Sequence, residues 1–263
     1  LPTQHNDEQA VTANRTQWRS VLVSEEQKIW RSLYLLQIVE SELERPEWRG
    51  EFLSNNGFAV VVELMEELHK LQVQQAKRGL PAQAEMLAVT GVPITLRVLR
   101  LCTREVQGDT QQLSQVIMFS PAMPTGLVKA CELVILLGNR EPVPNIVNAI
   151  IDGAQALSLF LLNAAAPEYN RDQQIFSRFF IPRSANSLAE LQLGPTEVQE
   201  SSKMASDAGI LVHKLLLQYP DEKVREEVGE VLLQLATSSH ELGTQLVDLM
   251  SECLSVQHKE CTR

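Results

Sequence analysis

The chain has 263 residues, of which 44% are apolar and only 5% aromatic, and its formal net charge is -10. The apolar content is enough for a substantial core, and its reliance on Leu, Val and Ala favours helix-on-helix packing over sheets. The excess of acidic residues argues against a broad phosphate-binding surface, so we expect no nucleic-acid partner. A local basic patch is still compatible with this net charge. No run of about 18 apolar residues occurs, so the sequence predicts no membrane span.

The N-terminal part is expected to begin with a polar, aperiodic arm over residues 1–14, followed by a short helix at 15–23. A longer helix is expected at 24–44, because Ser24 can cap it and acidic residues fill its first turn. Its predicted inner face follows steps of three and four residues: Ile29, Trp30, Leu33, Leu36, Val39 and Leu43.

The stretch Pro46–Leu71 is predicted to form a helix pair. Pro46 has the fixed φ that suits a first helical turn, and Asn55-Asn56-Gly57 can adopt the left-handed conformation that ends a helix. A second helix follows at once, with apolar residues at spacings of three and four. Neither helix can bury its apolar stripe alone, so this unit predicts a stack of helical repeats.

Further helices are predicted at 84–88, 94–106, 111–119, 128–137 and 146–162. We expect Gly91 and Pro93 to interrupt the chain between the first two, and Pro121 and Pro124 to end the third. The last of these helices is apolar on most faces, which is typical of an element in the middle of a core.

Residues 166–203 break the helical period and are rich in Pro and Ser, so we interpret them as an irregular insertion or a boundary. The period returns with helices predicted at 204–217, 221–237 and 240–255. The predicted organisation is therefore a flexible arm, an N-terminal helical-repeat block, the irregular segment and a C-terminal helical-repeat block, at 1–14, 15–165, 166–203 and 204–263. The predicted fold class is all-α, an armadillo/HEAT-like α-solenoid in which antiparallel helix pairs build a superhelix.

The sequence carries no recognisable catalytic motif. It contains no phosphate-binding loop, no glycine-rich dinucleotide motif, no H-E-x-x-H and no nucleophile elbow. Glu66-Glu67 and Glu226-Glu227 are adjacent on helices, so each pair points in different directions and cannot act as a general acid–base pair. We therefore predict no catalytic, cofactor-binding or metal-binding residue, and no cofactor.

The histidines and cysteines support the same prediction. None of the histidines has convincing metal-ligand spacing, and only His258 with Cys261, near Cys253, forms a weak zinc pattern: the five are His5, His69, His213, His240 and His258. The cysteine spacing implies no disulfide framework and fits a reducing compartment. Cys102 and Cys131 lie on apolar helical faces, where we expect buried structural thiols rather than nucleophiles.

Three sets of side chains leave a choice between a structural and a binding role. Arg97, Arg100 and Arg104 form a basic row that either pairs with nearby acids on a solvated face, the commoner case, or binds an acidic partner. The tryptophans are predicted as core anchors rather than exposed hot spots: Trp18, Trp30 and Trp48. A cluster of phenylalanines fits a docking clamp and an exposed recognition knob equally well: Phe176, Phe179 and Phe180.

A resemblance enters through residues 24–72. The run Trp30-Arg31-Ser32-Leu33-Tyr34-Leu35-Leu36-Gln37-Ile38-Val39-Glu40 precedes Pro46-Glu47-Trp48-Arg49, Phe52-Leu53 and Gly57-Phe58. This order resembles the non-catalytic helical-repeat region of the very large ubiquitin-specific proteases of the fat-facets type, in which W-x-x-L-Y-x-L-Q-I precedes P-x-W-x-x-x-F-L-x-x-G-G-F. Here Asn56-Gly57 stands for the Gly-Gly, and the rest of the chain matches only as a general armadillo-like pattern.

The resemblance implies a protein-interaction scaffold that positions substrates or partners, including ubiquitinated substrates, in a concave groove. The segment lacks the Cys and His boxes of the protease module, so the thiol protease would lie elsewhere in a longer parent, which the start without Met also leads us to expect. A cytoplasmic location, with the nucleus as an additional compartment, would follow. The phrase F-L-x-x-G-G also occurs in formin regulatory domains, so the alternative is an armadillo-type regulatory domain of a formin-like cytoskeletal regulator that binds a small GTPase. A free-standing enzyme would require Cys102 or Cys131 to be exposed beside a histidine.

Overall fold

The computed structural model of the chain describes residues 29–77, 79, 81–104, 117, 120–164, 211–238, 243–244, 246–248, 250–251 and 254–255. These residues form helices joined by short turns, and no strand occurs among them, so the all-α class is confirmed. The chain separates into two compact units, Leu1–Ala156 and Leu157–Arg263. This division falls inside a helix, whereas the predicted arm at 1–14 and the predicted segment at 166–203 lie outside the described residues.

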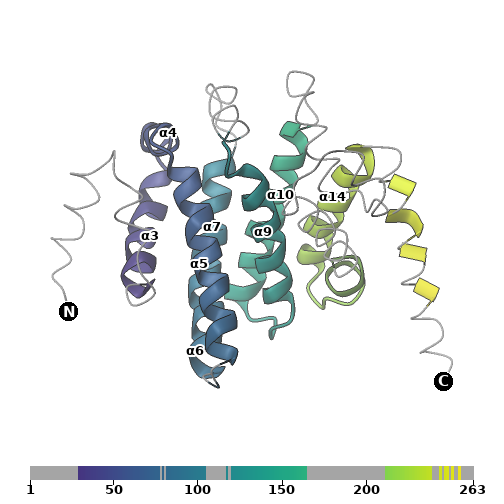
Figure 1. Ribbon diagram of the computed structural model, residues 1–263. Coiled ribbons are helices and arrows are strands. Elements are labelled where there is room, and N and C mark those ends of the chain that lie inside the picture. Colours follow the sequence, from purple (N-terminus) through teal and green to yellow (C-terminus); the bar gives the residue numbers. More distant parts are fainter. Residues whose placement is uncertain are drawn as a thin grey trace, which may run out of the picture. The chain divides into compact units, whose positions relative to one another are not determined.

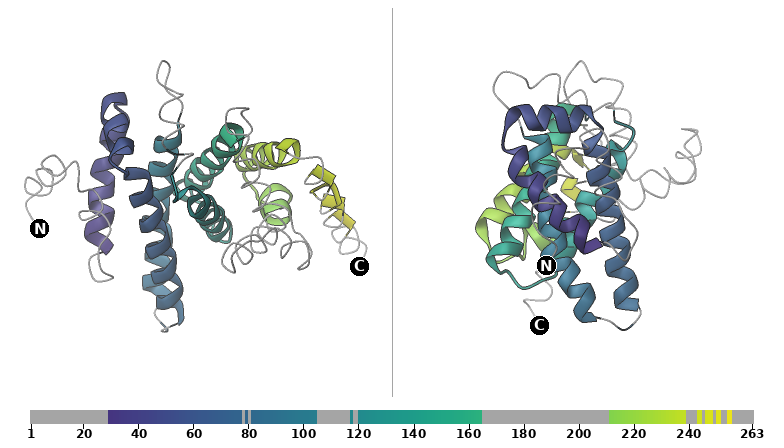
Figure 2. Two further views of the ribbon diagram at one scale, coloured as in Figure 1. Left: turned by 45° about the horizontal axis from the view of Figure 1, so that its top comes forward. Right: turned by 90° about the vertical axis from the view of Figure 1, so that its left-hand side faces the viewer.

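The first unit contains a succession of helices that lie side by side (Figures 1 and 2). In chain order they are α3 (Ile29–Leu43), α4 (Pro46–Ser54), α5 (Gly57–Lys77), α6 (Pro81–Met86), the π-helix η3 (Leu87–Gly91), α7 (Val92–Thr103), α9 (Met123–Gly138) and α10 (Pro144–Ala164), of which the part up to Ala156 belongs to this unit.

The helix pair α4–α5 forms as the sequence predicts. Pro46 occupies the first turn of α4, and Asn56 has a φ of 66°, the left-handed conformation that allows the chain to reverse between the two helices. Gly57 then begins α5, where a Cβ would lie closer than 3.0 Å to the ring of Phe52. The short turn therefore requires Gly at this position because the ring of the preceding helix fills the space.

The predicted interruption at Gly91 and Pro93 is wrong. The helix continues from α6 through η3 into α7, and the wider π-helical turn lies directly before Pro93. Pro93 has no N–H to offer the carbonyl of Val89, four residues earlier, and Asn145 of α10 donates its Nδ2 to that oxygen at 2.9 Å. A side chain that is distant in sequence thus replaces the missing donor, and the helix does not break.

The two prolines that were predicted to end the helix at 111–119 lie at the start of the next helix: residue 121 is in a turn, and Pro124 is in the first turn of α9, where a missing N–H costs nothing. The helix predicted at 111–119 lies outside the described residues, except for Ile117.

Among the described residues, Ala84–Thr103 is the one helix long and apolar enough to cross a membrane by length and composition alone. Its most apolar window is 72% buried within the protein, and core helices of soluble proteins pass the same test.

The helices of the first unit pack in two sets. One set contains α3, α7 and α10: α3 packs against α7, and Gly153 of α10 lies against Leu96 of α7. The other contains α5 and α9, which pack on each other, and α5 also contacts α4, α6 and α7. The core between them consists of large side chains that are almost fully buried, among them Leu36, Leu43, Phe52, Phe58, Met65, Leu68 and Leu96.

The second unit includes η5 (Leu211–Leu216) and α14 (Glu222–Ser238), which pack against each other. The predicted acidic start of the helix at 221–237 is confirmed, because Asp221 Oδ1 accepts a hydrogen bond from the Val224 N–H at 3.1 Å. In the helix predicted at 240–255, Leu246 is buried and Leu254 is 50% exposed.

Glycines in the first unit provide a test of its packing. A Cβ at Gly153 would lie closer than 3.0 Å to Val134, so we expect Gly153→Ala to lower the free energy of unfolding by roughly 1–3 kcal/mol through overpacking. Gly50 lies in α4, and a Cβ added there would meet nothing within 4 Å, so Gly50→Ala is the matched control and is expected to raise stability by up to about 1 kcal/mol. Urea unfolding followed by circular dichroism measures both, and an equal shift in the same direction for the two variants would contradict this account of the packing.

Candidate functional site

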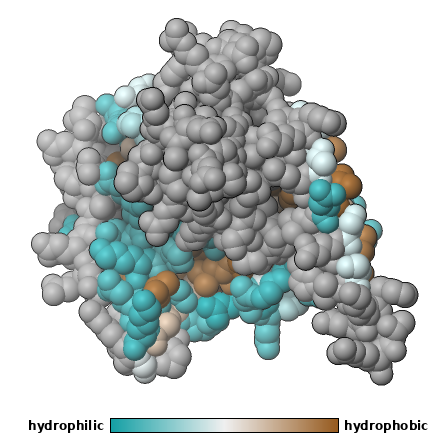
Figure 3. Space-filling model, turned by 45° about the vertical axis from the view of Figure 1, so that its right-hand side comes forward, coloured by the Kyte–Doolittle hydropathy of each residue, from teal (hydrophilic) through white to brown (hydrophobic). Residues whose placement is uncertain are grey.

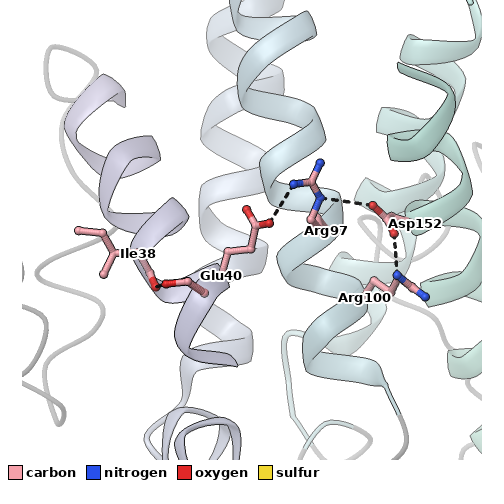
Figure 4. A network of polar contacts seen from close by, with 6 residues as sticks. Ile38, Glu40, Arg97, Arg100 and Asp152 are labelled. Atoms are coloured by element: carbon pink, nitrogen blue, oxygen red, sulfur yellow. Dashed lines mark hydrogen bonds and ion pairs between the residues drawn. The ribbon is translucent and has the colours of Figure 1, made fainter. Parts of the chain in front are cut away.

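Four charged side chains from three helices form a continuous polar ladder on the first unit (Figure 4). Arg97 of α7 donates its Nη1 to Glu40 Oε1 of α3 at 2.9 Å. Its Nε lies 3.7 Å from Asp152 Oδ2 of α10, and Arg100 Nη1 lies 3.1 Å from Asp152 Oδ1. The ladder Glu40–Arg97–Asp152–Arg100 therefore links α3, α7 and α10.

The helix geometry explains how the ladder forms. Arg97 and Arg100 are three residues apart on α7, so they lie on one face of that helix, above one another. Glu40 and Asp152 reach this face from either side because α3 and α10 both pack against α7. The carboxylates lie deeper than the arginines: the side chains of Glu40 and Asp152 are 20% and 10% exposed, those of Arg97 and Arg100 39% and 40%.

Burial and ion pairing have opposite effects on the pKa of Asp152. Burial raises the pKa of Asp152, and the positive charges of Arg100 and Arg97 offset only part of that effect. The hydrogen bond that Arg97 donates to Glu40 raises the pKa of Arg97, so this side chain is cationic at neutral pH.

The three arginines of the row predicted from the sequence have two different environments. Arg97 and Arg100 pair with nearby acids, as the solvated-face explanation predicts. Arg104 is the C-cap residue directly after α7, its side chain is exposed, and its backbone carbonyl accepts a hydrogen bond from Arg49 Nη1 at 3.2 Å. The sequence did not identify Glu40 and Asp152, and the available signal was an acid at position 152 inside an otherwise apolar helix.

A second polar cluster connects α5 to α9. Glu132 Oε2 lies 2.9 Å from His69 Nδ1 and 2.9 Å from Lys129 Nζ, and the Glu132 side chain is only 4% exposed. A buried carboxylate of this kind requires partners of opposite charge or hydrogen-bond donors, and both are present here. His69, which sequence spacing left without a role, thus belongs to a contact between two helices.

No metal site accompanies these clusters in the described part of the chain, where no group of three or more His, Cys, Asp or Glu could hold an ion. The weak zinc pattern of His258, Cys261 and Cys253 lies outside the described residues.

The two described cysteines are structural. Cys102 and Cys131 are both 2% exposed, so the prediction of buried thiols is confirmed. Burial raises the pKa of the Cys102 thiol to about 12, although the nearby positive charge of Arg49 lowers it in part. An accessible thiolate, which the free-standing enzyme hypothesis requires, is not provided by either residue.

The prediction that Trp30 anchors the core is wrong, because its side chain is 45% exposed. Trp30 stands six positions before the buried Leu36, which places it about 120° away around the helix. Trp48 is partly buried, whereas Trp18 and the phenylalanine cluster lie outside the described residues. Other exposed apolar residues of the first unit include Met86 and Val143. In the parts of the surface that Figure 3 colours by hydropathy, hydrophobic areas lie among hydrophilic ones.

Comparison with protein-family models, curated proteins and solved structures gives no match to this chain. The candidate site therefore rests on geometry. The polar ladder is the strongest candidate in the described residues because it joins three helices and presents half-exposed charged groups that are fixed in position.

The raised pKa of Asp152 predicts a pH effect. Between the ordinary carboxyl pKa of about 3.9 and the higher folded value, the native protein holds more protons than the unfolded chain, so this group's contribution to the unfolding free energy falls as pH rises. The side chain of Asp152→Asn cannot titrate. The free energy of unfolding of the wild type minus that of the variant should therefore be larger near pH 4 than at pH 7. Denaturation curves over this range test the sign, and a difference that grows with pH would mean that Arg97 and Arg100 outweigh burial.

The buried thiols predict low reactivity. Cys102, with its pKa raised to about 12 and its side chain enclosed, should react with iodoacetamide at pH 8 only after unfolding. Peptide mass spectrometry after labelling of native and urea-unfolded protein measures modification at each cysteine. Rapid modification of Cys102 in the native protein would revive the enzyme hypothesis.

Proposed function

We propose that this chain is a non-catalytic protein-interaction scaffold, built as an armadillo/HEAT-like α-solenoid within a large ubiquitin-specific protease of the fat-facets type. It positions substrates or partners, while the protease module lies elsewhere in the parent protein.

The packing of successive helices carries the proposal. In this proposal α5 and α9 correspond to one another in consecutive units, and so do α3, α7 and α10. Helices α5 and α9 pack on each other, α3 packs on α7, and Gly153 of α10 lies against Leu96 of α7 and Val134 of α9. This is the arrangement that helical repeats require, because each unit buries its apolar face only against its neighbours. A stack of this kind presents a row of helix faces to a partner, and the row α3, α7 and α10 bears the polar ladder.

Two further observations support the proposal. The residues of the resemblance occupy α3, α4 and the start of α5, with the reversal at Asn56 in the place of the family's first glycine. In the described part of the chain, the charged groups of the polar ladder and of the Glu132 cluster contact other helices, and the two cysteines are enclosed. These features fit a role in binding rather than in covalent chemistry.

A ubiquitin probe with a reactive C-terminal electrophile tests the family assignment. We expect it to label the full-length parent covalently and to leave residues 1–263 unlabelled, because the nucleophilic cysteine would belong to the parent's protease module. A folded, reduced parent that is not labelled would exclude the deubiquitinase assignment. Binding of residues 1–263 to a small GTPase in its GTP-loaded form would then favour the formin-like regulatory domain.

A further inference from the structure

We propose that the outer surface of the polar ladder binds an acidic segment of a protein partner, whose side-chain carboxylates contact the guanidinium groups of Arg97 and Arg100. This inference rests on the proposed scaffold function and adds the location and the chemistry of the binding surface.

The ladder is layered by charge. Its acids lie underneath, with Glu40 and Asp152 20% and 10% exposed, and its guanidinium groups lie above them, 39% and 40% exposed. An approaching partner therefore meets the positive groups first, although the acids balance their charge from below. The attraction of exposed charges weakens quickly with distance in water, so this ordering decides which sign a contacting group experiences.

Both guanidinium groups have donors that no described residue uses. Arg97 directs Nη1 at Glu40 and Nε at Asp152, and Arg100 directs Nη1 at Asp152. The Nη2 groups of both, and Nε of Arg100, have no partner among the described residues. Because the buried carboxylates already hold the two side chains in place, a ligand would lose less conformational entropy on binding them than on ordering free arginines.

Arg104 extends the positive surface along α7. It follows Arg100 by about one helical turn, its side chain is exposed, and it makes no ion pair with a described residue. Three arginines thus follow one another along one helix in a chain whose net charge is -10.

Carboxylates of a peptide fit this surface better than a nucleic acid does. The planar guanidinium matches a carboxylate with two parallel hydrogen bonds, and two guanidinium groups three residues apart, roughly 4.5 Å along the axis, can contact neighbouring acidic side chains. A nucleic acid gains affinity mainly from many phosphate contacts over a long basic path, and the acidic net charge of the chain opposes this.

The test uses the full chain and a fluorescein-labelled peptide of alternating glutamate and glycine, measured by fluorescence anisotropy at low salt. We expect binding that weakens as sodium chloride is added. Arg100→Gln and Arg97→Gln should each weaken it about fivefold or more, and Arg104→Gln about twofold. The matched control is Arg45→Gln, since Arg45 is also an exposed arginine, paired to Glu42 at 3.1 Å outside the ladder, and this variant should bind as the wild type does.

Further variants separate binding from folding. Arg100→Lys keeps the charge over Asp152 but loses the bidentate fork, so it should fold normally and still bind more weakly. Arg104→Gln leaves the ladder intact, and thermal melts identify any variant that fails to fold. Four results would each overturn the proposal. The wild type could fail to bind the peptide, could bind a serine–glycine peptide equally well, or could prefer a single-stranded oligonucleotide. The folded variants Arg100→Lys and Arg104→Gln could also both bind with full affinity. Each of these results would leave the labelling of the parent by the ubiquitin probe unaffected.

Discussion

The first unit depends on how closely its helices approach the continuous helix formed by α6, η3 and α7. Gly91 lies against Leu68 and Leu33, so a Cβ there would meet Leu68 at 2.9 Å, and Gly153 permits the same closeness between α10, α9 and α7. Close packing at these positions brings the flanks of α3 and α10 near enough for Glu40 and Asp152 to reach the arginines of α7. The polar ladder is therefore a consequence of the steric fit, because a wider helix separation would leave its buried acid without partners.

Two buried or partly enclosed polar contacts of the first unit join different helices. Asn145 of α10 bonds to the carbonyl of Val89 before Pro93, and Glu132 of α9 contacts His69 of α5. A buried polar group without a partner costs about 1–3 kcal/mol, so a shift of one helix along another would be opposed at several places at once. In this way polar contacts select one register among the many that similar Leu and Val side chains would tolerate.

The same arrangement bears on function. Most titratable groups that come together in the first unit hold helices against one another, and the described thiols are enclosed. Arg97 and Arg100 differ from these groups because they pair with a buried acid, are 39% and 40% exposed, and have donors that no described residue uses. The proposed scaffold role would use these two residues, because their structural contacts hold them in fixed positions on the surface.

The sequence by itself determined the helical character of this chain, the α4–α5 pair and the burial of Cys102 and Cys131, because these follow from local spacing, from the backbone freedom of Asn56 and Gly57 and from apolar neighbours. The sequence placed Trp30 on the buried face because, near the end of a helix, a spacing of three and four residues is compatible with more than one face. It predicted a break at Pro93 because the side chain that hydrogen-bonds to the carbonyl of Val89, Asn145, is distant in the sequence. Only the tertiary structure decided that Glu40 and Asp152 meet Arg97. These residues lie more than fifty positions from the arginine in the sequence, and their contact exists only because two helices approach α7 from opposite sides.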